Sequence, residues 1–186
     1  MEEKEHLLSV LKEVKNSLKK KEVIKLKELS NQTIHSASIQ QDEISIAIAV
    51  IVYSLSKIIE RTNYQAYPNW EYFLKKIMQN IERAISSLEK NNEEMLKKHI
   101  KNIEIFIEEL TGNLKFHIQQ VFEKAKINKA SRIYEHGISM ERTAKLLGIT
   151  IFELAEYAGK TGISDINLSK TLSVKERIKY VTELFT

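Results

Sequence analysis

The sequence predicts an all-α protein, and three observations support this fold class. Glycine and proline are scarce, with five glycines and one proline among 186 residues. Lys, Glu, Leu and Ile are abundant, and all four tolerate the interior of a helix. Apolar residues recur every three or four positions through most of the chain, which is the periodicity of amphipathic helices. We therefore expect a helical bundle over most of the sequence.

Composition excludes several classes of protein. The chain carries 29 basic and 25 acidic residues, a net charge of +4, which permits contact with phosphates without demanding it. It contains no cysteine, so disulfides and thiolate zinc sites are excluded. The first ten residues, MEEKEHLLSV, are polar and charged and do not resemble a signal peptide. We expect a cytoplasmic protein.

The first two helices are expected at residues 3–18 and 22–37. In the first, Leu7, Leu11, Val14 and Leu18 are spaced to share one face of a helix. The second carries Val23, Leu26, Leu29 and Ile34 at similar spacing, and polar residues blur its end. His35 lies in that polar end, where a lone histidine among hydroxyl groups is typical of a hydrogen-bonded structural residue.

Residues 44–59 form the most hydrophobic run and are expected to be the centre of the bundle. Asp42 and Glu43 precede the run and suit the start of a helix. The segment ISIAIAVIV also alternates like a β-strand, but no second strand is apparent to pair with it. The run has about 16 residues, fewer than the about 20 that span a membrane, so we expect no membrane segment.

A long helical hairpin is expected next. Residues 62–69 hold the single proline and predict a loop, and Asn69 is a plausible cap for a helix over 70–88. A turn at 89–92 leads into a long helix from Glu93, whose apolar stripe keeps heptad steps as far as Val121. Gly112 lies off that stripe, so we predict that it bends the helix at most. The stripe could also bind a second copy of the chain, which leaves a homodimer open.

Residues 131–163 predict two short helices that meet at a glycine turn. Ser139 can cap the first helix, and Glu141 lies in its first turn. Gly148 stands where a left-handed residue ends that helix, and Thr150 with Glu153 forms a capping box for the second. The small or apolar residues at core-facing spacings are Ala144, Leu147, Ile149, Leu154 and Tyr157.

These spacings resemble a helix-turn-helix, whose second helix commonly enters the DNA major groove. In a DNA complex, Thr150, Ile151 and Glu156 would face the bases. The side chains expected to contact phosphates are Lys126, Lys129, Arg132, Arg142, Lys145 and Lys160. The base-facing set nevertheless lacks Arg, Lys, Asn and Gln, the usual base readers. A helical pair that packs or binds a protein therefore remains an alternative.

The sequence predicts three units. They are a helical bundle over residues 1–125, the helix-turn-helix unit over 126–163, and a linker with a C-terminal docking helix over 164–186. Ser173 and Glu176 form a capping box for that last helix, which is too short to be stable alone.

No enzymatic constellation is visible. The five histidines are scattered, and Glu3-x-x-His6 lacks the second Glu-x-x-His motif of a di-iron bundle. Arg132 and His136 are separated by three residues, fewer than the four to six of helical nucleases of the HEPN type. Neither a phosphate-binding glycine loop nor a nucleophile elbow is present. We expect a protein that is not an enzyme and needs no cofactor or metal.

Residues 129–185, about a third of the chain, resemble a small family of prokaryotic antitoxin-like proteins. The residues that carry the resemblance are Ala130, Tyr134, Gly137, Ser139, Ala144, Leu147, Gly148, Phe152, Glu153, Gly162, Ile163 and Asp165. Such proteins are often paired with PIN-domain ribonuclease toxins. The resemblance implies that the helix-turn-helix unit serves regulation or dimer assembly and that residues 165–185 bind the toxin, with Arg177 and Phe185 as anchors. The N-terminal bundle resembles no family.

Two functions are expected from these features. The first is a non-enzymatic regulator, either a DNA-binding transcriptional regulator or an antitoxin-like protein. The alternative is an interaction adaptor in which Ile151 and Phe152 enter an apolar pocket of a protein partner. Solvent exposure separates the two, because exposed Phe152 beside Ile151 favours a protein partner, whereas an exposed face of lysines favours DNA.

Overall fold

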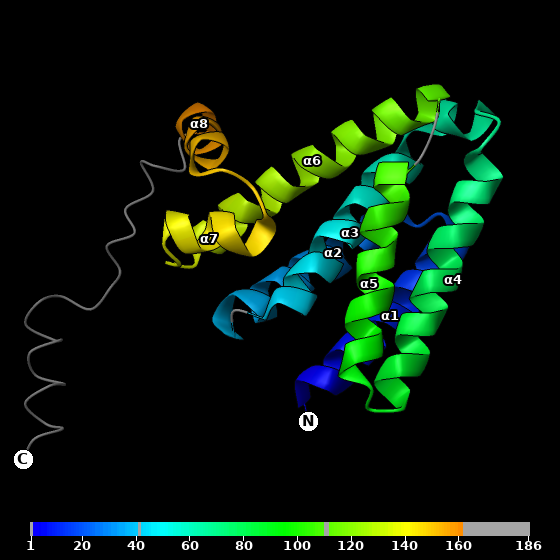
Figure 1. Ribbon diagram of the computed structural model, residues 1–186, viewed down its shortest axis with the longest axis horizontal. Coiled ribbons are helices and arrows are strands. Elements are labelled where there is room, and N and C mark those ends of the chain that lie inside the picture. The colour runs from blue at the N-terminus through cyan, green and yellow to red at the C-terminus, as the bar shows by residue number, and fades with distance from the viewer. Residues whose placement is uncertain (1, 41, 110–111, 162–186) are drawn as a thin grey trace, which may run out of the picture.

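The computed structural model describes residues 2–40, 42–109 and 112–161, and within these residues the fold is all-α without strands. Figure 1 shows the order of the helices. They are α1 (Glu2–Lys20), α2 (Val23–Gln40), α3 (Glu43–Glu60), the 3₁₀ helix η1 (Thr62–Ala66), α4 (Trp70–Glu89), α5 (Glu93–Glu109), α6 (Gly112–Glu135), α7 (Met140–Leu147) and α8 (Ile151–Thr161).

Helix α3 is the centre of the molecule, as its hydrophobicity predicts. The side chain of Asp42 caps it by accepting hydrogen bonds from the amides of Ile44 (3.3 Å) and Ser45 (2.7 Å). Thirteen of its 18 residues are buried. Buried hydroxyl groups bond within the helix, as when Ser54 Oγ donates to the Val50 carbonyl at 2.7 Å. The helical interpretation of this run is confirmed, because residues Glu43–Glu60 form one continuous α-helix.

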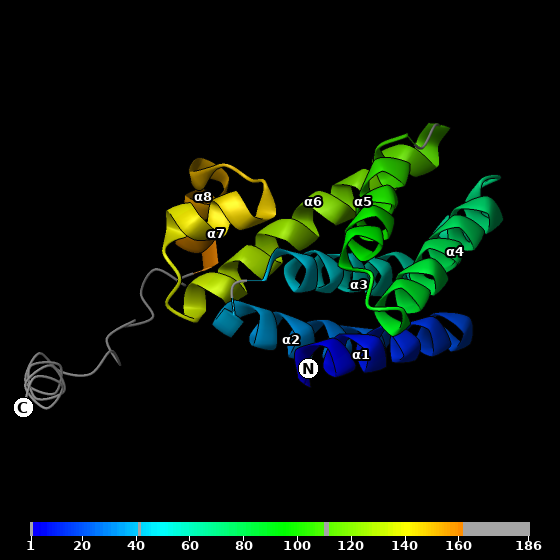
Figure 2. The ribbon, with the colours of Figure 1, turned by 60° about the horizontal axis from the view of Figure 1, so that its bottom comes forward.

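Helices α1 and α2 lie together along one side of the molecule, and α3 runs beside α2 (Figure 2). A tight turn with Lys21 at φ 57° joins α1 to α2. Asn91 at φ 56° makes the corresponding turn between α4 and α5, which form the predicted hairpin.

The long helix predicted from Glu93 to Val121 is wrong in one respect. Helix α5 ends at Glu109 and a separate helix, α6, begins at Gly112. The two helices run in different directions (Figure 1). The apolar spacing continues through both, with Ile107 and Leu114 each buried. Apolar spacing that continues along the sequence does not reveal a change of helix direction, because α5 and α6 each bury their own row of apolar residues.

Helix α6 links the bundle to the α7–α8 pair. It continues through residue 125, where the sequence predicts the end of the bundle. Ile138, Leu147 and Leu154 belong to the same cluster of buried residues as the core of the bundle. One hydrophobic core therefore extends from α1 to α8. In the part of the chain described here, no helix combines the length and the apolar character needed to cross a bilayer.

Candidate interaction surface

The corner between α7 and α8 has the caps that the sequence predicts. Ser139 Oγ accepts a hydrogen bond from the amide of Arg142 at 3.2 Å and starts α7. Gly148 has φ 62° and ψ 35°, the left-handed conformation that ends α7. The amide of Ile149 donates to the Ala144 carbonyl at 3.1 Å and closes the turn. The direction in which α8 leaves α7 is therefore fixed by local hydrogen bonds.

The predicted capping box opens α8. The amide of Thr150 donates to Glu153 Oε2 at 2.8 Å, and the amide of Glu153 donates to Thr150 Oγ1 at 3.1 Å. These bonds from Thr150 lower the pKa of Glu153 and hold its carboxylate charged beside the positive end of the helix. The first turn of α8, which carries Ile151 and Phe152, is thus held firmly.

The inner faces of α7 and α8 pack against the bundle. Ala144 (2% exposed), Leu147 (7%), Leu154 (0%) and Ala158 (2%) are all buried. Helix α6 contacts both helices, and α3 contacts α7. The buried faces of α7 and α8 therefore hold the two helices on the bundle and are not accessible to a partner.

Two polar contacts also tie this region to the bundle. Lys129 on α6 donates from Nζ to Asn31 Oδ1 of α2 at 2.8 Å, and its ammonium lies 4.3 Å from the centre of the Tyr53 ring. His35 Nδ1 of α2 lies 3.3 Å from Nε2 of His136, which follows α6. These contacts agree with a structural role for His35. Both partners of Lys129 are distant in sequence, so the sequence analysis missed them.

Lys129 is a correction to the predicted set of phosphate contacts. Its side chain is fully buried. Burial, and to a smaller degree the charge of Arg132, lowers the pKa of Lys129 to about 8. An ammonium that is enclosed by α2, α3 and α6 cannot contact a phosphate at the surface. We therefore leave Lys129 out of any nucleic-acid surface.

The outward face of α8 is apolar at its first turn. Phe152 is 86% exposed and Ile151 is 47% exposed. Ala155, Glu156 and Gly159 complete the outward face, and all three are exposed. Thr150 is exposed as well, but its hydroxyl is engaged by Glu153 at 2.8 Å. Of the three predicted base-facing residues, Ile151 and Glu156 lie on this face and Thr150 lies beside it.

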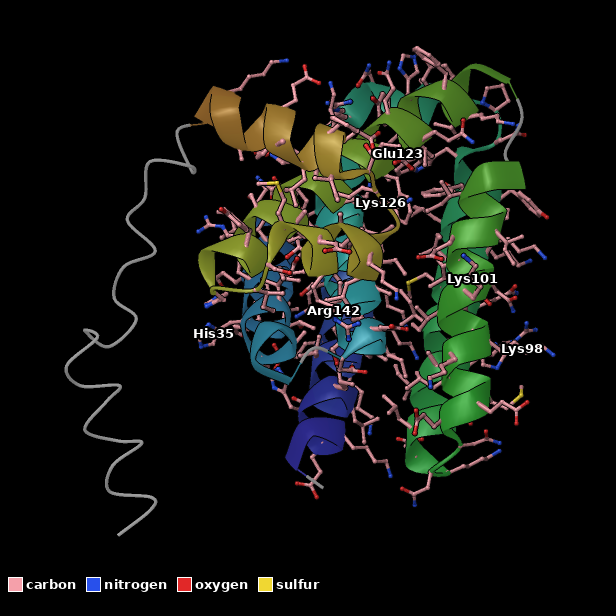
Figure 3. All side chains as sticks on the ribbon, turned by 60° about the vertical axis from the view of Figure 1, so that its left-hand side comes forward. His35, Lys98, Lys101, Glu123, Lys126 and Arg142 are labelled. Carbon is pink, nitrogen blue, oxygen red and sulfur yellow. The ribbon has the colours of Figure 1, made fainter. Side chains whose placement is uncertain are left out.

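The predicted cations do not form one basic surface. Lys126 pairs with Glu123 at 3.1 Å, and Lys160 pairs with Glu156 at 2.5 Å. Figure 3 shows Lys126 and Glu123 together on α6, and Arg142 on α7. Arg132, Arg142 and Lys145 are also exposed. Acidic partners thus reduce the positive field around Lys126 and Lys160.

Two predicted partner-binding residues, Arg177 and Phe185, lie outside the described residues, as do the predicted linker and C-terminal helix.

Arg132 lies on α6 and His136 lies directly after it, where His136 faces His35. No cluster of three or more His, Asp or Glu side chains suited to a metal ion occurs within residues 2–40, 42–109 and 112–161.

Comparison of the chain with protein-family models, curated proteins and solved structures finds no match. The function must therefore be argued from the surface itself.

Proposed function

We propose that the chain is a non-enzymatic interaction adaptor, in which α7 and α8 act as a helix-turn-helix unit that binds a protein partner. The observation that carries this proposal is the exposure of Phe152, at 86%, beside the half-exposed Ile151. Burying a phenylalanine in an interface contributes about 1.5–3 kcal/mol. A single aromatic anchor of this kind supplies much of the affinity of many protein interfaces.

The supporting structure favours a preformed site. Phe152 lies directly after a capping box whose hydrogen bonds are 2.8 and 3.1 Å long. Leu154, on the opposite side of α8, is fully buried. A side chain that is held on a fixed helix loses less entropy on binding than one on a mobile loop. The exposed phenyl ring does not contribute to the core of the chain, so a role in binding accounts for it.

DNA binding by the same unit is the second candidate. The exposed cations Arg132, near the end of α6, and Arg142 and Lys145, on α7, favour binding to DNA phosphates. The outward face of α8 argues against it, since Ile151, Phe152 and Glu156 offer no group of the kind that reads base edges. A protein partner agrees better with that face.

The resemblance to antitoxin-like proteins indicates which partner to test first. A ribonuclease of the PIN-domain class would fit, with residues 165–185 as a second contact that includes Arg177 and Phe185. In that case the adaptor would hold a toxin through two segments and would act as its regulator. Other protein partners remain compatible with the surface around Phe152.

Quantitative affinity capture from cells that produce the protein tests the proposal. The full chain is compared with Phe152→Ala and with Phe116→Ala, a control that removes another exposed aromatic ring, 62% exposed and located on α6. We expect a partner that is retained by the wild type and by Phe116→Ala. Its recovery should fall at least about tenfold with Phe152→Ala, which corresponds to about 1.4 kcal/mol. Equal recovery by all three proteins would contradict the proposal.

Fluorescence anisotropy with a mixed-sequence DNA duplex tests the second candidate. At about 50 mM salt, phosphate contacts are strong and even non-specific binding is readily detected. We expect no saturable binding under these conditions. Binding that falls steeply with salt and is lost in an Arg142→Ala, Lys145→Ala double variant would replace the adaptor with a DNA-binding regulator.

A further inference from the structure

A pocket of about 460 Å³ lies where α8 meets the bundle. Its volume falls within the range of about 300–1,000 Å³ that is typical of small-molecule sites, which often lie between structural units. Helix α3 contributes Tyr53 and Lys57, and Arg61 follows directly after it. Helix α6 contributes Lys124 and Asn128, and helix α8 contributes Tyr157. A molecule in this pocket would contact the bundle and α8 at the same time.

Aromatic and aliphatic groups form most of the pocket surface. Tyr53 and Tyr157 come from different helices and contribute two aromatic rings, and Val121, Ala125 and Ile127 supply aliphatic groups. Flat, apolar molecules gain from contact with such surfaces, because aromatic rings bury a large area and prefer offset or edge-to-face packing.

The rim of the pocket is positively charged. Lys57, Arg61 and Lys124 stand against one acid, Glu60. Glu60 already accepts hydrogen bonds from Lys27 at 2.7 Å and from Lys57 at 3.1 Å. These bonds lower the pKa of Glu60, so it stays charged and engaged with lysines. Lys124 is exposed and forms no ion pair with a carboxylate among the described residues, so it is available to an anion.

Polar groups in the pocket can also serve a ligand. Burial raises the pKa of Tyr53, so its hydroxyl keeps its proton and can donate a hydrogen bond. Asn128 Nδ2 lies 3.5 Å from the hydroxyl of Tyr157. A contact at that distance is weak, so exchanging it for a bond to a ligand costs little.

We propose that this pocket binds a small, flat organic anion, namely an aromatic ring system that bears a carboxylate, sulfonate or phosphate group. The two tyrosines and the aliphatic groups would hold the ring, and Lys124 would hold the charge. Lys57 and Arg61 add positive potential nearby, but Lys57 already donates to Glu60 and Arg61 already donates to the hydroxyl of Tyr64. This site is separate from the surface around Phe152, and the proposal stands whether or not a protein partner binds there.

Two dyes with related aromatic frames test the proposal on the full chain. The probe is 1-anilinonaphthalene-8-sulfonate, which is anionic, and the reference is N-phenyl-1-naphthylamine, which lacks the charge. Fluorescence titration is carried out on the wild type, on Lys124→Glu and on Lys98→Glu. The last variant makes the same change of net charge at another exposed lysine, which Figure 3 shows on α5, away from the α7–α8 pair. Far-UV circular dichroism checks that each variant is folded.

We expect saturable binding of the anionic dye at one site. Its dissociation constant should rise at least fivefold in Lys124→Glu and less than twofold in Lys98→Glu, because only the former change lies in the pocket. Binding of the uncharged dye should be weaker and equal in all three proteins. The proposal is overturned if the anionic dye does not saturate, if the two variants weaken it equally, or if the uncharged dye binds as tightly as the charged one.

Discussion

Lys129 is the residue whose environment differs most from what its type suggests. Its ammonium is buried beneath Tyr53 and donates to Asn31 at 2.8 Å, and the contacts described for it include no carboxylate. Desolvation of a charge is costly unless the charge is paired. The pKa of Lys129 is accordingly lowered to about 8 from 10.5. The contacts with Asn31 and Tyr53 hold α6 on α2 and α3, while desolvation of the ammonium opposes them at neutral pH.

We predict that Lys129→Met raises the free energy of unfolding at pH 7. A shift from 10.5 to about 8 corresponds to a penalty of about 3 kcal/mol. The bond to Asn31 and the contact with Tyr53 offset part of it, so the expected gain is about 1–2 kcal/mol. Urea unfolding measures this value, with Lys124→Met as an exposed control that should change it by less than about 0.5 kcal/mol. A loss of stability in Lys129→Met would show that the two contacts outweigh desolvation.

The same pair of proteins should differ in pH dependence. Because the folded pKa is lowered, the unfolded chain binds more protons between about pH 8 and 10.5, and the wild type gains stability as the pH rises through that window. Lys129→Met lacks this gain. The difference in the free energy of unfolding between Lys129→Met and the wild type should therefore be largest below about pH 8 and should shrink as the pH rises toward 10.5. An advantage that is constant with pH would contradict the assigned pKa.

Two glycines in the α7–α8 pair should respond in opposite ways to the same substitution. An added Cβ meets no atom within 4 Å at Gly148 or at Gly159, so neither change causes a clash. Gly148 has φ 62°, where alanine is strained by about 1–2 kcal/mol, whereas Gly159 lies within a helix, where alanine is favoured by about 1 kcal/mol. Thermal unfolding should show Gly148→Ala destabilised and Gly159→Ala stabilised. Equal effects would mean that Gly148 does not need a left-handed conformation.

At the scale of elements, α8 has one face for packing and one that is left exposed. Leu154→Ala should lower the free energy of unfolding by about 2–4 kcal/mol, because its side chain is fully buried. Phe152→Ala should change it by less than about 0.5 kcal/mol, since the ring is 86% exposed. Chemical denaturation of both variants measures the difference. If Phe152→Ala were as damaging as Leu154→Ala, the ring would belong to the core and could not act as an anchor for a partner.

The elements also show why some features could be predicted from the sequence. Ser139, Gly148 and the pair Thr150 and Glu153 make hydrogen bonds over a few residues, so local spacing is enough to predict them. The change of direction between α5 and α6 was not predicted, because the apolar stripe continues across it. The burial of Lys129 was not predicted either, because Asn31 lies 98 positions away in the sequence.

At the scale of the whole molecule, α6 joins the bundle and the α7–α8 pair into one packed structure. A single cluster of buried residues includes Val14 of α1, Ile103 of α5 and Leu154 of α8. The pocket at Tyr53 and Tyr157 and the exposed Phe152 lie on the same rigid unit but use different helical faces. A ligand in the pocket would therefore leave Phe152 accessible to a partner.

Site-specific photo-crosslinking tests the adaptor most directly. A benzophenone amino acid replaces Phe152 in one version of the full chain and Phe116 in another, and both are irradiated in cells that produce the protein. The account predicts an adduct from position 152 that is absent from position 116 and that nuclease leaves unchanged. An adduct at position 152 that nuclease destroys, or identical products from both positions, would contradict it.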